Sequence, residues 1–148
     1  MITRRTNYQR RHSAFKDKPV RRPMSTRYVE DELDAITREI LHVAERSCFT
    51  CGSTKELQIG HLVERRHRHC RWDTHESGSV HLQCGPCNAL HESKPQKYIN
   101  MFTIRFGERA YADVLERAHS KQKLTYSDLL AMLEEKEAQL KQLKGKAA

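Results

Sequence analysis

The chain has 148 residues, of which 37% are hydrophobic and 31% charged, and its formal net charge is +8. This length has room for one compact domain with an extension, not for two full domains, and so small a core is expected to need a staple. No apolar run approaches membrane-spanning length, and the basic N-terminus lacks the apolar segment of a signal peptide. We therefore expect a cytoplasmic protein with no membrane partner.

The positive charge is concentrated at the N-terminus. Residues 1–27 hold nine Lys or Arg side chains against Asp17 alone, whereas residues 28–148 are neutral overall. Few large apolar side chains occur there, which predicts a flexible arm at 1–27 that is disordered without a partner. A basic arm on a neutral body suits nucleic acid, with a solubility tail as the alternative. Its candidate DNA contacts are Arg4, Arg5, Arg10, Arg11, Arg21 and Arg22.

Hydrophobic periodicity and turn residues predict the elements that follow. In chain order these are an amphipathic helix from about Thr26 to Arg46, strand-like pieces at Leu57–Leu62 and Ser79–Gln83, and helices from near Cys87 to Pro95, from there to Phe106, at Glu108–His119 and from Tyr126 to about Leu143. Thr125 is the expected N-cap of the last helix, and Gly145 is expected beyond its end. A leucine stripe on this helix (Leu129, Leu133, Leu140 and Leu143) predicts core packing or a dimer seam.

Four of the five cysteines form two CxxC pairs, Cys48–Cys51 and Cys84–Cys87. Each pair can present two thiolates to one tetrahedral ion, so the two pairs together predict a closed structural Zn²⁺ site. A thioredoxin-like redox pair would need only one CxxC in a βαβ setting. Cys70 is left over and is interpreted as an ordinary free thiol.

Six of the nine histidines fall between residues 61 and 91, among the cysteines. His61 follows Gly60 on the first strand-like piece, His81 precedes Cys84 on the second, and Asn88 directly follows Cys87. This order of Cys, Gly-His, His and Cys-Asn resembles an HNH (ββα-metal) nuclease whose core is stapled by a zinc ribbon.

More specifically, the chain resembles the NinG/Rap family of lambdoid phage recombination endonucleases over about residues 29–143. The matching pieces are Cys48-Phe-Thr-Cys51-Gly52, Gly60-His61, Arg71-Trp72-Asp73, His81-Leu-Gln83-Cys84-x-x-Cys87-Asn88, Tyr98, Arg105-Phe-Gly107-Glu108, His119 and Leu124-Thr125. The resemblance implies a phage protein, working in the bacterial cytoplasm, that cuts branched recombination intermediates such as Holliday junctions, flaps and forks.

The resemblance also implies roles for single residues. His61 would be the general base that activates a water molecule, and Asn88 would ligate a catalytic Mg²⁺ or Mn²⁺. Two departures affect the metal site: Gly60 and Gln58 stand where acids are expected, and Ser79 replaces the middle Asn of the motif. His81 and His91 are therefore the further candidate ligands.

These observations predict a small α+β protein with a zinc-stapled HNH core at 48–106, flanked by the helix at 28–47 and a helical region at 107–148. The expected partner is DNA, and a homodimer is a candidate state because resolving a junction needs two opposed nicks. Between the strands, Arg65, Arg66, Arg68 and Arg71 are candidate phosphate contacts. The alternatives are a zinc-ribbon DNA-binding or scaffolding protein without catalysis, and an HNH nuclease that acts on linear duplex DNA.

Overall fold

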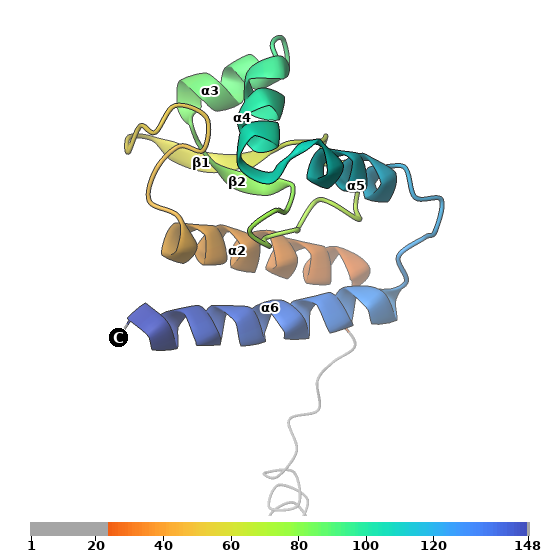
Figure 1. The fold of residues 1–148 in the computed structure, drawn as a ribbon. Helices are drawn as coiled ribbons and strands as arrows, with labels where there is room; N and C mark the ends of the chain where they lie inside the picture. Colours follow the sequence, from red (N-terminus) through yellow and green to blue (C-terminus); the bar gives the residue numbers. More distant parts are fainter. Residues whose placement is uncertain (1–23, 148) are drawn as a thin grey trace, which may run out of the picture.

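A two-stranded antiparallel hairpin lies at the centre of the computed structural model, which describes residues 24–147 (Figure 1). Strand β1 (Leu57–His61) pairs with β2 (Val80–Cys84), so that Leu57 lies opposite Cys84 and His61 opposite Val80. Both strands lie within one residue of the predicted pieces. The loop at 62–79 joins the strands at the end of the hairpin that carries His61.

Five helices accompany this hairpin in the part of the chain that the structure describes. They are α2 (Thr26–Ala44), α3 (Gly85–His91), α4 (Gln96–Phe106), α5 (Glu108–Ala118) and α6 (Tyr126–Ala147). Gly107, whose φ is 88°, separates α4 from α5 as predicted, because few residues other than glycine adopt that backbone conformation. The small α+β architecture expected from the sequence is therefore confirmed.

One helix begins where the periodicity predicts and another ends later than predicted. Helix α2 begins at Thr26, as predicted, where Ser25 caps it by accepting a hydrogen bond from the backbone N–H of Tyr28 (3.1 Å). Thr26 and Arg27, which the predicted division of the chain counts with the arm, therefore belong to the helix. Helix α6 continues through Gly145 to Ala147, which makes the predicted end wrong. Residues 1–23, which hold most of the predicted basic arm, lie outside the described residues.

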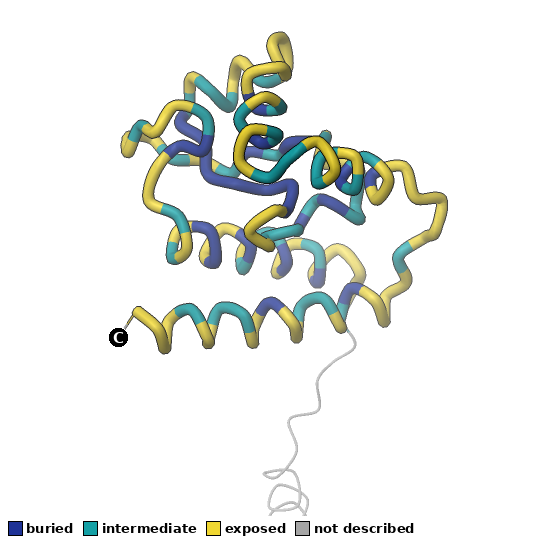
Figure 2. Tube along the Cα trace, viewed as in Figure 1, coloured by how far each residue is buried: buried dark blue, intermediate teal, exposed yellow. Residues whose placement is uncertain are grey.

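The two faces of the hairpin are covered by different elements, as alternation of side chains along a strand requires. On one face the strands pack against α2 through Leu41, Leu57, Ile59, Val80 and Leu82. The opposite face carries His81, whose ring stacks on Phe49 with centroids 4.1 Å apart and lies near Phe102 of α4. Figure 2 shows that burial is concentrated in β2, where all five residues are buried.

Helix α6 lies alongside α2, and the two run in the same direction (Figure 1). Leu129 at its start packs with Val29, Leu33 and Trp72, and Lys144 near its end pairs with Glu39 at 2.5 Å. Leu129 is fully buried in this contact and Leu133 packs against the same cluster. Core packing therefore accounts for this end of the leucine stripe, which is not available as the predicted dimer seam.

Thr125 and Asp128 cap the start of α6, as predicted: the Asp128 backbone N–H donates to Thr125 Oγ1 at 3.2 Å, and the Thr125 N–H donates to the Asp128 carboxylate at 2.7 Å. Helix α5 also joins the main core, because Val114 and Ala118 pack in one cluster with Phe49 and Phe102. Within residues 24–147, none of the helices combines the length and apolar character that crossing a bilayer requires.

Candidate functional site

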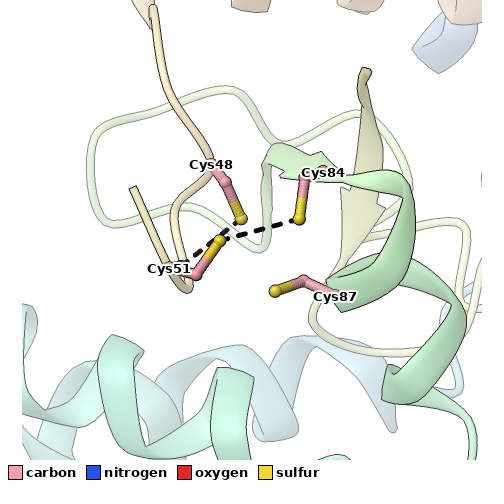
Figure 3. A group of neighbouring side chains, drawn as sticks. All are labelled: Cys48, Cys51, Cys84 and Cys87. Carbon is pink, nitrogen blue, oxygen red and sulfur yellow. Dashed lines mark hydrogen bonds between the residues drawn. The ribbon is translucent and has the colours of Figure 1, made fainter. Parts of the chain in front are cut away.

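Two turns of the chain bring four cysteine sulfur atoms together (Figure 3). The Sγ atoms of Cys48, Cys51, Cys84 and Cys87 all lie within 4.8 Å of one another, and those of Cys51 and Cys84 are 3.6 Å apart. Zinc–sulfur bonds of about 2.3 Å place the sulfurs of a tetrahedral site about 3.8 Å apart. The cluster can therefore hold one metal ion such as zinc.

Backbone hydrogen bonds set both turns. The N–H groups of Gly52 and Cys51 point back at Cys48, to its carbonyl oxygen (2.8 Å) and its sulfur (3.4 Å) respectively. Gly52 has a φ of 78°, which closes the turn in a conformation that disfavours a side chain. Cys84 ends β2 and Cys87 lies in the first turn of α3, so the strand-to-helix junction presents the second pair.

The thiol acidities fit a site that needs a cation. Burial opposes ionisation of Cys48, but backbone N–H donors around its sulfur outweigh it and lower the pKa to about 7. Burial and the three neighbouring cysteine sulfurs raise the pKa of Cys87. Four thiolates cannot crowd together without a positive charge among them, and a bound metal supplies that charge.

An open groove of about 1460 Å³ runs along β1, between α2 on one side and α3 and α5 on the other. It contains His61, Asn88 and His91, three of the four residues predicted for the catalytic centre. The cysteine cluster borders it through the shared helix α3, whose first residue, Gly85, also lines the groove. The fold thus brings the predicted base and two predicted ligands to one cavity.

His61 is half-buried at the end of β1, and its ring is held by one hydrogen bond. Nε2 lies 3.1 Å from the backbone carbonyl oxygen of Arg71, so Nε2 carries the proton and donates it. Burial lowers the pKa of His61 to about 4; the Arg71 carbonyl opposes this shift and the Arg65 charge adds to it. The imidazole is therefore neutral at physiological pH, with the Nδ1 lone pair available to accept a proton.

Asn88 on α3 reaches back across to β1. Its Nδ2 donates to the side-chain oxygen of Gln58 at 3.0 Å, and both residues line the groove. Gln58 occupies a position where the resemblance leads one to expect an acid. Because the Gln58 oxygen accepts this hydrogen bond, Asn88 Oδ1 is the amide oxygen available to a hard cation, together with water or phosphate as further ligands. In the described residues, the cysteines are the only group of three or more Cys, His, Asp or Glu side chains arranged to hold a metal.

His91 also lines the groove, one helical turn beyond Asn88. Its Nε2 donates to the carbonyl of Leu62 at 3.1 Å, which leaves Nδ1 with the lone pair. That Nδ1 is buried and has no hydrogen-bond partner among the described residues. His91 therefore stays a candidate ligand, although Nδ1 must become accessible before it can bind an ion.

His81, the fourth residue predicted for the catalytic centre, does not line this groove, and the structure does not bring it together with His61, Asn88 and His91. It pairs with Gly60 across the hairpin, on the face opposite to His61. Its side chain is buried, with Nδ1 2.6 Å from the Glu45 carboxylate and Nε2 2.9 Å from the Gly78 carbonyl. Both ring nitrogens are thus occupied by oxygen contacts inside the core and do not face the groove.

The absence of an acid before His61 has a packing explanation. A Cβ at Gly60 would lie 2.3 Å from the side-chain oxygen of Gln83. The Gln83 side chain is fully buried and is held in place by its Nε2, which donates to Thr50 Oγ1 at 2.7 Å. An aspartate at position 60 would therefore collide with Gln83. Ser79, at the place of the middle motif residue, donates to the Cys70 carbonyl at 2.7 Å and so holds the loop beside His61.

The loop arginines are less available for DNA than the sequence suggests. Arg65 and Arg71 both bind Asp34 of α2, Arg68 pairs with Glu30, and Arg66 pairs with Glu64 of the same loop. Arg71 is the most buried of the four side chains and Arg66 the most exposed. Helix α2 thus anchors most of this loop. The loop arginines are engaged in ion pairs that stabilise the fold, which reduces their availability to a ligand.

Helix α2 contributes four residues to the groove that sequence reasoning did not select, and two of them, Asp34 and Arg38, are an acid and an arginine. Asp34 is the shared partner of the loop arginines, and Arg38 makes no hydrogen bond or ion pair with the residues that the structure describes. Spacing along α2 shows which residues share a face but not what lies opposite, so no sequence signal pointed to them. Arg4, Arg5, Arg10, Arg11, Arg21 and Arg22 lie outside the described residues.

Comparison with known proteins identifies the family. The family model described as bacteriophage lambda NinG protein matches residues 2–146, nearly the whole chain. No curated protein and no solved structure matches the chain. Because the family model covers far more than half of the sequence, the chain belongs to the NinG family.

Proposed function

We propose that this NinG-family protein is a metal-dependent DNA endonuclease of the HNH type, acting on branched recombination intermediates. The observation that carries the proposal is His61: a neutral imidazole with one nitrogen fixed on a backbone carbonyl, in a groove that also contains Asn88. A general base needs this combination of a lone pair, a defined tautomer and access to substrate. The preference for branched DNA rests on the resemblance to the recombination family.

In the proposed reaction, Nδ1 of His61 takes the proton from the water that attacks the scissile phosphate. The Arg71 carbonyl holds the Nε2–H, so the ring does not rotate as it gains charge. Asn88, with Gln58 beside it, would hold a Mg²⁺ or Mn²⁺ ion, which, when bound, neutralises charge on the phosphate. The cysteine cluster, holding Zn²⁺, would fix the junction from which α3 carries Asn88 into the groove.

A zinc-dependent DNA-binding protein without catalysis is the alternative, and one observation favours it: no acid stands at position 58 or 60 beside His61. The two functions differ in whether DNA is cut in the presence of Mg²⁺ or Mn²⁺. An HNH nuclease for linear duplex would cut, but without preference among DNA structures.

Zinc binding is the first expectation. Purified protein should contain one zinc per chain by elemental analysis, and Cys84→Ser should lose the metal and unfold at a lower temperature, because metal binding contributes folding free energy. Cys70→Ala removes a buried thiol that lies outside the cluster and should keep the zinc. Folded wild-type protein without metal would contradict the proposed zinc site.

Cleavage should depend on His61. On a panel of linear, flapped, forked and four-way DNAs, His61→Ala should slow single-turnover cleavage by roughly 10² to 10⁴, since the base acts in the transition state. DNA affinity should change only a few-fold. The control is His75→Ala, which alters an exposed histidine that does not line the groove. A His61→Ala protein that cuts at the wild-type rate would rule out this base, and equal rates on all DNAs would favour the linear-duplex function.

The proposed metal ligands predict a gain of function. Gln58→Glu keeps the side-chain length and places a carboxylate next to Asn88, so half-maximal cleavage should need several-fold less Mg²⁺. Gln142→Glu adds the same charge on the exposed part of α6 and should leave the Mg²⁺ dependence unchanged. If Gln58→Glu needs as much Mg²⁺ as wild type, or more, the ion is not held beside Asn88.

Arg38 is the groove cation that should meet a phosphate, since its guanidinium is exposed and has no partner among the described residues. Arg38→Gln should weaken DNA binding and reduce the slope of log K against log[salt] by about 1 unit. Arg46→Gln removes an exposed arginine that does not line the groove and is the matched control. Equal effects of the two substitutions would show that the groove is not the preferred DNA contact.

A further inference from the structure

The carboxylate of Asp34 is the most heavily hydrogen-bonded side chain of the groove. It lies on α2, three-quarters buried, and accepts four hydrogen bonds from the loop that joins β1 and β2. The donors are Trp72 Nε1 (2.6 Å), Arg65 Nη2 (2.5 Å), Arg71 Nε (3.0 Å) and Arg71 Nη2 (2.5 Å). Arg71 is therefore bound through two of its nitrogens, in a fixed orientation.

The same Arg71 contributes its backbone carbonyl to His61. With its side chain held by Asp34 and the next residue, Trp72, fully buried, Arg71 has little freedom to move. The chain on either side is also fixed, because Ser79 donates to the Cys70 carbonyl and the Val80 N–H donates to the Asp73 carbonyl. The Arg71 carbonyl oxygen, which accepts the Nε2–H of His61, is thus fixed by the Arg71 side chain and by the neighbouring residues on both sides.

We propose that Asp34 is a positioning residue for His61: by holding Arg71, it keeps the Arg71 carbonyl at Nε2 and leaves Nδ1 as the nitrogen that accepts a proton. The role of Nδ1 in cleavage rests on the proposed nuclease function, whereas the state of the His61 ring does not. Asp34 acts through Arg71 and touches neither the base nor the substrate.

The charge on Asp34 is part of the arrangement. Burial opposes its ionisation, but the hydrogen bonds from Arg71 and Trp72 and the arginine charges outweigh it, and the pKa of Asp34 is lowered. Asp34 is therefore a carboxylate at neutral pH and partly offsets the two guanidinium charges beside His61.

A second acid on α2 supplies a matched control. Glu30 pairs with Arg68, and so ties the same helix to the same loop without engaging Arg71. Asp34→Asn and Glu30→Gln each remove one negative charge from α2 and weaken its attachment to the loop, Asp34 through Arg65, Arg71 and Trp72 and Glu30 through Arg68. Only Asp34→Asn should change the tautomer of His61.

The experiment combines nitrogen NMR of the histidine rings with single-turnover cleavage of a branched DNA. In wild type and Glu30→Gln, His61 should show a single tautomer protonated at Nε2. Asp34→Asn should convert it to a mixture of tautomers and slow cleavage by about 10- to 100-fold, the usual size of an effect when the hydrogen bonds that support a functional histidine are disturbed. DNA affinity should be equal or higher in both variants, because each loses a negative charge.

An Asp34→Asn protein with the wild-type His61 tautomer, or with a cleavage rate equal to that of Glu30→Gln, would overturn the proposal. Should Asp34→Asn fail to fold, Arg71→Met breaks the same connection while Asp34 keeps its bonds to Arg65 and Trp72, and it must give the same change at His61. If wild type cuts no DNA but the tautomer still depends on Asp34, the nuclease function is lost and the positioning role stands.

Discussion

A two-stranded hairpin does not hold its shape alone in water, and the arrangement of this protein follows from how its hairpin is supported. One face packs on α2 through Leu41, the other on Phe49 and the aromatic residues of α4. The four cysteines join the turn before β1 to the end of β2, where a metal would fasten both.

Helix α2 has the largest part in this support. It covers one face of the hairpin, packs along α6, and binds the loop at 62–79 through two acids, Glu30 and Asp34. These acids neutralise arginines that would otherwise repel one another beside His61. The groove is consequently less positive than its composition suggests, and Arg38 is left as its unpaired cation within the described chain.

The histidines of this region serve different purposes although they are close in sequence. His61 has one nitrogen bound and one available, which suits a base. His81 has both nitrogens facing oxygen acceptors inside the core. His67 and His119 donate to the last carbonyls of α5, at Ala118 and Leu115, and so cap that helix. Hydrogen-bond partners, more than position in the motif, separate the candidate catalytic histidine from the structural ones.

Local patterns were sufficient for the elements and for the cysteine cluster. Periodicity and turn residues predicted both strands within a residue and most helix boundaries, since these depend on neighbouring residues. The paired CxxC spacing predicted a four-sulfur cluster, because each pair acts as a local turn and two such turns suit one ion. The positions of His61 and Asn88, next to a predicted strand end and a predicted helix start, likewise led to one groove.

Contacts between distant segments were decided only by the tertiary structure. His81 looked like a ligand because it lies near Cys84, but strand alternation and the register with Gly60 turn it to the other face. The stripe on α6 could not reveal its partner, which is α2, nearly a hundred residues earlier. Asp34 carries no motif; its importance arises because the loop after β1 returns to α2 and places Arg71 between it and His61. Sequence spacing determines which residues share an element's face, whereas packing determines what that face meets.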